Sequence, residues 1–160
     1  MIVFDGYCNG ASTKDQEHMR RVTRTAPEII LHENAQAHRD QGAFLANDKN
    51  KCVFVAQLIK YLQAANFITL QAVGDADTLI AETALQVAAT TGPVTVVADD
   101  TDVLVLLVHH FRPHMADVFM LSEKSVRSKA CSVVMPVRRI CARIGPVVAS
   151  ALPVIHAISG

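Results

Sequence analysis

The chain has 160 residues, of which 51% are hydrophobic, and its formal net charge at pH 7 is zero. This length and hydrophobic content exclude a disordered chain and suit a single domain over residues 1–160 with its own core. Zero net charge excludes a uniformly basic nucleic-acid binder. The charge is uneven, however: residues 1–100 hold 8 basic and 12 acidic side chains, and residues 101–160 hold 7 and 3. An acidic site beside a basic flank suits a metal-dependent enzyme that acts on a polyanion.

The cysteines and the longest apolar stretch indicate in which cellular compartment the protein is expected. Cys8, Cys52, Cys131 and Cys141 contain no C-x-x-C pair, so neither a structural zinc site nor a disulfide framework is predicted. No basic segment precedes the apolar start, so we expect no signal peptide. Residues 144–158 are too few for a membrane span and include two prolines. We therefore expect an intracellular protein, nuclear or cytoplasmic, with no membrane partner.

The chain opens with a short strand and a polar segment. Met1–Phe4 is an apolar run that predicts a buried strand, and Asp5 stands at its end. Residues 12–21 are polar and helix-forming. Lys14 and Arg21 are seven residues apart, so they project from the same side of a helix. That helix is either a charged, solvated helix or one whose basic side binds phosphates.

The next segments alternate between helix and strand. Residues 47–51 read as a loop, and the apolar spacing over 53–65 predicts an amphipathic helix that Asn66 ends. β-branched and aromatic residues predict a strand over 67–72. A further helix is predicted over 79–89. This alternation is typical of α/β proteins.

The most informative stretch is an apolar run that ends in carboxylates. Val94–Ala98 has the composition of a strand buried on both faces, and Asp99, Asp100 and Asp102 follow it. In open α/β sheets, ligands collect beyond the carboxyl ends of the strands. Carboxylates this close repel one another, and a hard divalent cation is the usual compensation. The alternative is that one aspartate caps the next helix and the others are solvated.

The remainder of the chain predicts a strand and two helical pieces. Residues 102–111 are apolar enough for a buried helix or strand, which periodicity does not separate. A strand is predicted over 118–121. Residues 137–144 and 147–158 read as two helical pieces separated by Gly145-Pro146. Together these segments predict an α/β sheet with helices on both faces.

Acidic residues recur where predicted strands end. Asp5 follows the first strand, Asp75 and Asp77 follow the second, and Asp100 and Asp102 follow the third. Helix capping explains any one of these positions, because Asp is favoured at N-caps and in first turns. Capping explains their recurrence less well, so the pattern favours a metal site at one sheet edge.

In these motifs the chain resembles the flap-endonuclease branch of the PIN-like nucleases, over most of residues 2–121. Val3-Phe4-Asp5-Gly6 resembles that family's strand-end motif. Gly74-Asp75-Ala76-Asp77 resembles its paired-acid motif, and Val97-Ala98-Asp99-Asp100-Thr101-Asp102 resembles the next acidic pair. The resemblance implies a Rossmann-like, PIN-type three-layer sandwich with a mostly parallel central sheet. It also implies a fragment or shortened member of the family, incomplete at both ends, of the kind that mobile elements carry.

The same resemblance implies a metal-dependent nuclease that hydrolyses phosphodiester bonds. Lys14, Glu17 and Arg21 stand like the Lys, Glu and Arg that the family places beside the scissile phosphate, and Lys14 and Arg21 would be the catalytic cations. The cofactor would be Mg²⁺ or Mn²⁺, as a pair of ions that activate water and stabilise the leaving oxygen. The implied metal ligands are Asp5, Asp75, Asp77, Asp100 and Asp102.

The expected partner is nucleic acid, DNA rather than RNA. Residues 122–132 read as a mobile basic loop. No base-reading motif is present, so we expect contacts with the backbone and recognition of structure rather than sequence. The residues expected to bind nucleic acid are Arg20, Lys124, Arg127 and Lys129.

Two other functions stay open on the sequence. The chain could be an inactive nuclease-like remnant that binds nucleic acid or protein without cleaving it. Alternatively, Asp100-Thr101-Asp102-Val103 after a buried strand resembles the opening of the haloacid-dehalogenase phosphatases. In that case Asp100 would be the nucleophile, with Lys124 or Lys129 as the downstream lysine.

Overall fold

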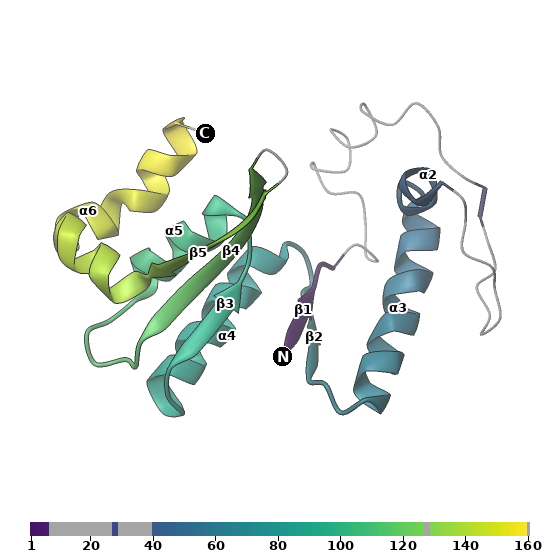
Figure 1. Cartoon of the computed structure of the whole chain (residues 1–160), viewed down its shortest axis with the longest axis horizontal. Helices are drawn as coiled ribbons and strands as arrows, with labels where there is room; N and C mark the ends of the chain where they lie inside the picture. Colours follow the sequence, from purple (N-terminus) through teal and green to yellow (C-terminus); the bar gives the residue numbers. More distant parts are fainter. Residues whose placement is uncertain (7–26, 29–39, 127–128, 160) are drawn as a thin grey trace. The chain divides into compact units, whose positions relative to one another are not determined.

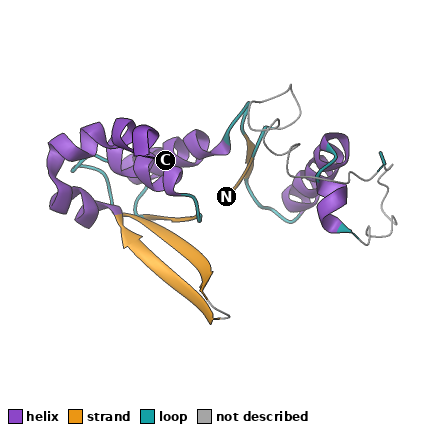
Figure 2. Ribbon diagram, turned by 90° about the horizontal axis from the view of Figure 1, so that it is seen from above, coloured by secondary structure: helices purple, strands orange, loops and turns teal. Residues whose placement is uncertain are grey.

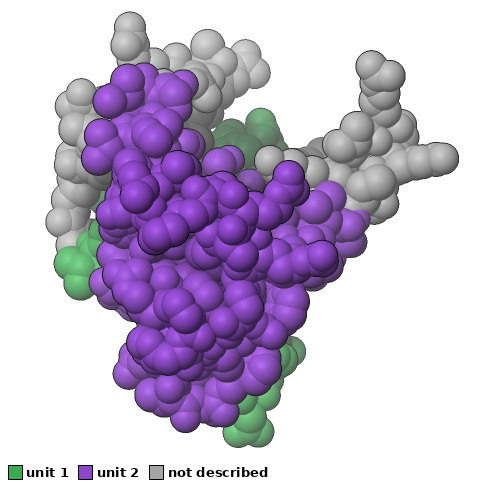
Figure 3. Space-filling view, turned by 90° about the vertical axis from the view of Figure 1, so that its left-hand side faces the viewer, with its two compact units in different colours: residues 1–76 green, residues 77–160 purple. Residues whose placement is uncertain are grey.

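The structure is a computed structural model that describes residues 1–6, 27–28, 40–126 and 129–159 (Figure 1). It is a mixed α/β protein with two compact units, Met1–Ala76 and Asp77–Gly160 (Figure 3). The α/β class is therefore confirmed, whereas the single-domain organisation stays a prediction. The predicted helix over 12–21 lies outside the described residues.

The first unit contains two paired strands and two helices. Strands β1 (Ile2–Phe4) and β2 (Thr69–Gln71) are parallel, with Val3 opposite Leu70. Helices α2 (Gln41–Leu45) and α3 (Asp48–Ala64) lie between them in the chain. Both predicted strands are thus confirmed, although β2 is shorter than expected.

Helix α3 begins earlier than the sequence predicted. The Asn47 side chain caps it by accepting hydrogen bonds from the backbone N–H groups of Lys49 and Asn50, so residues 47–51 are not a loop. The polar residues that read as a loop are a helix cap and first turn. As predicted, the helix ends before Asn66. The φ of Asn66 is 64°, a left-handed conformation that Asn tolerates. Its expected apolar face is not buried, because Val53 is 41% exposed.

The second unit is built around a three-stranded sheet. Helix α4 (Ala76–Thr90) precedes β3 (Val94–Val97), helix α5 (Thr101–His110) leads to β4 (Val118–Val126), and β5 (Lys129–Pro136) leads to α6 (Val137–Ser159). Strand β3 is parallel to β4, and β4 is antiparallel to β5. The β3–α5–β4 segment is therefore a parallel crossover unit. The ambiguous residues 102–111 belong to a helix.

The core of this unit lies between the sheet and its helices. Leu107, Val103 and Val108 of α5 are almost completely buried and share one cluster with Met120 of β4 and Val137 of α6. Helix α4 contributes Ala81, Ala84, Leu85 and Ala88 to the same cluster. The strongest apolar run of the sequence thus became the central buried helix of this unit.

One strand prediction and one loop prediction are wrong in this unit. Strand β3 is not buried on both faces: Val96 is 8% exposed, but Val97 is 69% exposed. Among the described strands, β3 pairs only with β4. Of the predicted basic loop, residues 122–126 and 129–132 are strand instead, because β4 continues to Val126 and pairs with β5 as the long antiparallel ribbon in Figure 2. The β-branched residues of β5 stabilise this pairing. The sequence did not predict the strands because the lysines of the segment are typical of a loop.

Helix α6 consists of two pieces, as predicted. Gly145 has a non-helical φ of 76° and ψ of 165°, and Pro146 follows it. Of the helices in the described segments, α6 alone is long and apolar enough to pass for a membrane span. The Gly145 break, however, leaves residues 146–159 as the longer continuous piece, about 21 Å at 1.5 Å per residue, against a hydrocarbon core of about 30 Å. The absence of a membrane partner stays a prediction.

Candidate functional site

The strongest candidate site lies where β3 ends and α5 begins. Asp100 is the N-cap of α5, with φ −85° and ψ 133°, and its Oδ1 accepts a hydrogen bond of 3.0 Å from the backbone N–H of Asp102. Asp102 stands in the first turn, where a negative charge is favourable beside the helix N-terminus. The capping role that the sequence left open for one aspartate therefore belongs to Asp100.

Asp99 has a structural role. Its Oδ1 accepts hydrogen bonds from the Ser122 hydroxyl, at 2.7 Å, and from the Glu123 backbone N–H, at 2.9 Å. Both donors belong to β4, and Ser122 is only 5% exposed. Asp99 thus ties the end of β3 to the neighbouring strand. Asp99 is not one of the predicted metal ligands, and its carboxylate faces β4.

Replacing Asp99 by alanine should lower the free energy of unfolding of the second unit by about 1–3 kcal/mol, because the buried Ser122 hydroxyl loses its acceptor. Urea denaturation followed by circular dichroism measures this change. The double variant Asp99→Ala/Ser122→Ala should recover part of the loss, because no buried donor is then left unpaired. Equal stability of Asp99→Ala and the wild type would contradict the structural role.

Asp102 has a partner that sequence analysis missed. Its Oδ1 lies 2.6 Å from Nε2 of His156, in the second piece of α6. The Asp102 and His156 side chains are 50% and 34% exposed, so the pair is open to solvent on one side. No spacing rule could have found this contact, because 54 residues separate its members. The three aspartates of the segment therefore have different partners. Asp99 binds β4, Asp100 caps the N-terminus of α5, and Asp102 contacts α6.

Metal binding at this helix end stays a prediction. No group of three His, Cys, Asp or Glu side chains that could hold a metal ion occurs in the part of the chain that the structure describes. Mg²⁺ nonetheless binds through one or two carboxylates and keeps several waters. Asp100 and Asp102 offer such a pair at one helix end, and Asp100 is exposed. A metal ion there would rest on these two carboxylates and on water.

The other predicted ligands belong to the start of the chain and to the start of α4. Asp5 Oδ1 accepts a hydrogen bond of 2.9 Å from the backbone N–H of Ala76, the first residue of α4, so Asp5 serves as a cap from a distant strand. Asp75 precedes that helix and Asp77 lies in its first turn. Asp5 and Asp75 belong to the first unit, whereas Asp77 belongs to the second with Asp100 and Asp102. A site that joins all five carboxylates stays a prediction.

Four of the six predicted basic residues lie outside the described residues: Lys14, Arg20, Arg21 and Arg127. Glu17 lies outside them as well. Lys124 lies on β4 opposite Cys131, and Lys129 lies on β5 opposite Val126. These two lysines therefore belong to the hairpin rather than to a loop, and their role in binding nucleic acid stays a prediction.

Comparisons with known proteins do not assign the chain to a family. No family model matches it, and no match was found among curated proteins or solved structures.

Proposed function

We propose that the chain is a PIN-like, divalent-metal-dependent nuclease that hydrolyses phosphodiester bonds in structured nucleic acid, DNA rather than RNA. The observation that carries this proposal is the pair of carboxylates, Asp100 and Asp102, at the α5 N-terminus directly after a strand of a parallel pair. In α/β proteins this edge is where ligands bind. The acids at the starts of α4 and α5 support the same reading, because both helices begin just after a strand.

The proposal includes a PIN-type sandwich with a mostly parallel sheet. Its support is local: β1 is parallel to β2, and β3 is parallel to β4 across the α5 crossover. The β4–β5 pairing is antiparallel, which suits an antiparallel hairpin at the edge of an otherwise parallel sheet.

Each residue of the site has a definable role in this function. Asp100 and Asp102 would bind Mg²⁺ or Mn²⁺, which supplies an activated water and stabilises the leaving oxygen when bound. His156 fixes one oxygen of Asp102 and so orients the carboxylate, while Asp99 holds the strand end in place through β4. Asp5, Asp75 and Asp77 would add ligands or water contacts. Lys14 and Arg21 would offset charge on the phosphate, and Arg20, Lys124, Arg127 and Lys129 would bind the backbone.

A second candidate function is a nuclease-like remnant that binds nucleic acid or protein without cleaving it. One observation favours it: the described residues contain no three-ligand group.

The deciding experiment is cleavage of labelled 5′-flap, single-stranded and duplex DNA with Mg²⁺ or Mn²⁺. The wild-type chain should cleave, and Asp100→Asn/Asp102→Asn should not, because asparagine keeps the cap and the size but removes both charges. The matched control Asp48→Asn/Glu82→Gln removes the same charge at two exposed positions and should cleave like the wild type.

Mn²⁺ binding measured by electron paramagnetic resonance on the same variants separates the two candidates. Loss of both binding and cleavage in the Asp100/Asp102 variant, but not in the control, would support the nuclease. A folded wild-type chain that neither binds Mn²⁺ nor cleaves DNA would leave the remnant as the better reading. Trapping of a phosphoenzyme at Asp100 would favour the phosphatase instead.

A further inference from the structure

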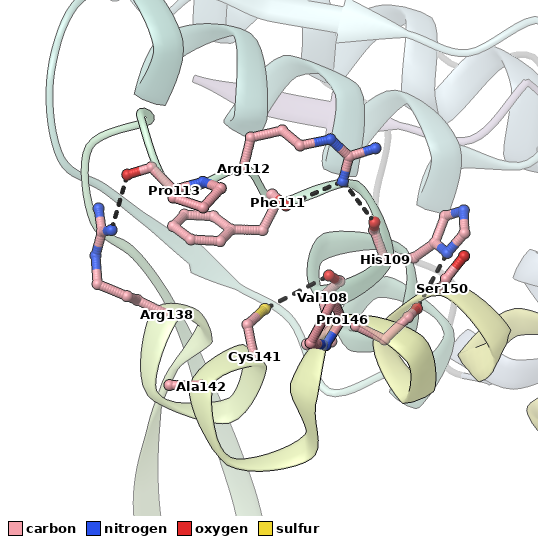
Figure 4. Close-up of a pocket in the computed structure, with 11 residues that line it drawn as sticks. Val108, His109, Phe111, Arg112, Pro113, Arg138, Cys141, Ala142, Pro146 and Ser150 are labelled. Atoms are coloured by element: carbon pink, nitrogen blue, oxygen red, sulfur yellow. Dashed lines mark hydrogen bonds between the residues drawn. The ribbon is translucent and has the colours of Figure 1, made fainter.

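A second site is formed by the far end of α5 and both pieces of α6. A pocket of about 620 Å³ lies there, within the size range of small-molecule sites. Its walls are mostly apolar and include Phe111, Pro113, Cys141, Pro146 and Ala149 (Figure 4). The N-terminus of α5 carries Asp100 and Asp102, so this pocket at the other end of the helix is separate from the proposed nuclease site.

The pocket is held open by fixed elements. The first piece of α6 contacts α5 through the Cys141 thiol, which donates a hydrogen bond of 3.5 Å to the Val108 carbonyl. The second piece contacts α5 through His109 Nδ1, which lies 3.1 Å from the Ala149 carbonyl oxygen and so carries the proton. Because Gly145 turns the chain between these contacts, the two pieces diverge and leave the space between them and α5 (Figure 4).

The charged and ionisable nitrogen groups that line the pocket are basic. Among the described residues its lining contains Arg112, Arg138 and His109, together with the neutral Ser150, and no aspartate or glutamate. Arg138 is engaged: it donates to the Asp117 carboxylate and to the carbonyls of Pro113 and Met115, and it lies over the Phe111 ring at 5.1 Å from the centroid.

Arg112 is the charge left for a ligand. Its Nη1 donates to the carbonyl oxygens of His109 and Phe111, both at 3.0 Å, which fixes the plane of the guanidinium. Within the described part of the chain, Arg112 Nε and Nη2 have no hydrogen-bond acceptor, and the side chain has no carboxylate partner. Fixed guanidinium groups with free donors are well suited to bind carboxylate-like anions.

The two arginines also act on the titratable groups near the pocket. Burial raises the pKa of the Cys141 thiol, and the charges of Arg112 and Arg138 oppose that rise. Burial also lowers the pKa of His110, and the neighbouring His109 and Arg112 lower it further, against a smaller effect of Glu82. The pocket region therefore has a surplus of positive charge beside an apolar surface.

We propose that this pocket binds a small amphipathic anion. An aromatic or aliphatic body would pack against Phe111, Pro146 and Ala149, and a carboxylate, sulfonate or phosphate group would accept hydrogen bonds from Arg112. This site does not depend on the nuclease proposal, because none of its residues belongs to the carboxylate group at the start of α5.

The test uses 8-anilinonaphthalene-1-sulfonate as an anionic probe and N-phenyl-1-naphthylamine as its neutral counterpart. We expect one anionic probe per chain, with a fluorescence increase. Arg112→Gln should weaken binding of the anionic probe about tenfold or more, as expected for one lost charge-assisted contact, and leave the neutral probe unchanged. Ala142→Phe, which narrows the pocket from its exposed rim, should weaken both probes.

The control variant is Arg139→Gln, which removes the same charge from an exposed α6 arginine outside the pocket lining and should bind both probes like the wild type. As an independent readout, the anionic probe should slow alkylation of Cys141 by iodoacetamide and leave Cys52 of α3 unaffected. Equal losses in Arg112→Gln and Arg139→Gln would overturn the proposal. Unchanged binding by Ala142→Phe would overturn it as well.

Discussion

Replacing Leu107 by alanine should lower the free energy of unfolding of the second unit by about 2–5 kcal/mol, a large part of the stability of a small domain. Leu107 is 0% exposed and lies in the cluster that joins α5 to the sheet and to α6. The same cluster contains Val103 of α5 and Met120 of β4, so the side chain is enclosed by more than one element. The variant therefore loses burial and leaves a cavity.

The matched control is Ile158→Ala, which removes the same number of carbon atoms from a side chain that is 82% exposed. Its free energy of unfolding should stay within about 0.5 kcal/mol of the wild type. Urea titrations with an unchanged slope would show that both values refer to the same folded state. A similar loss in both variants would mean that Leu107 does not lie in a tightly packed core.

Replacing Gly6 by alanine should break the end of the β1–β2 pairing and destabilise the first unit by about 1–3 kcal/mol or more, as overpacking does. A Cβ atom at this position would overlap the Ala72 carbonyl oxygen and lie 2.6 Å from the Val73 carbonyl carbon. These are backbone atoms, which cannot turn aside as a flexible side chain can. The Gly6 N–H also donates a hydrogen bond of 2.9 Å to the Gly74 carbonyl oxygen, so a shift of Gly6 would break that bond.

Amide hydrogen exchange measures this effect locally. The Ala72 amide donates to the Phe4 carbonyl across the strand pair, so its exchange should become faster in Gly6→Ala. Gly74→Ala is the control, because a Cβ there would have no atom within 4 Å. Faster exchange in both variants, or in neither, would show that the close approach of Gly6 to residues 72–73 does not determine the stability of the β1–β2 pairing.

The sequence by itself determined the local features of this protein. It located β1, the end of α3 at Asn66 and the break of α6 at Gly145-Pro146. Each of these features depends on a few neighbouring residues. They are the apolar run of β1, an Asn that tolerates a positive φ, and a Gly followed by a Pro that has no backbone N–H to donate. Such preferences act before any tertiary contact forms, so composition and spacing report them.

Only the tertiary structure decided which polar residues meet and which apolar strands are covered. Asp99 joins Ser122, and Asp102 joins His156, across 23 and 54 residues of chain. Val97 is 69% exposed although it ends an apolar run, and the β4–β5 hairpin depends on cross-strand pairing rather than on the lysines that suggested a loop. These outcomes are set by packing between distant segments, which no window of sequence contains.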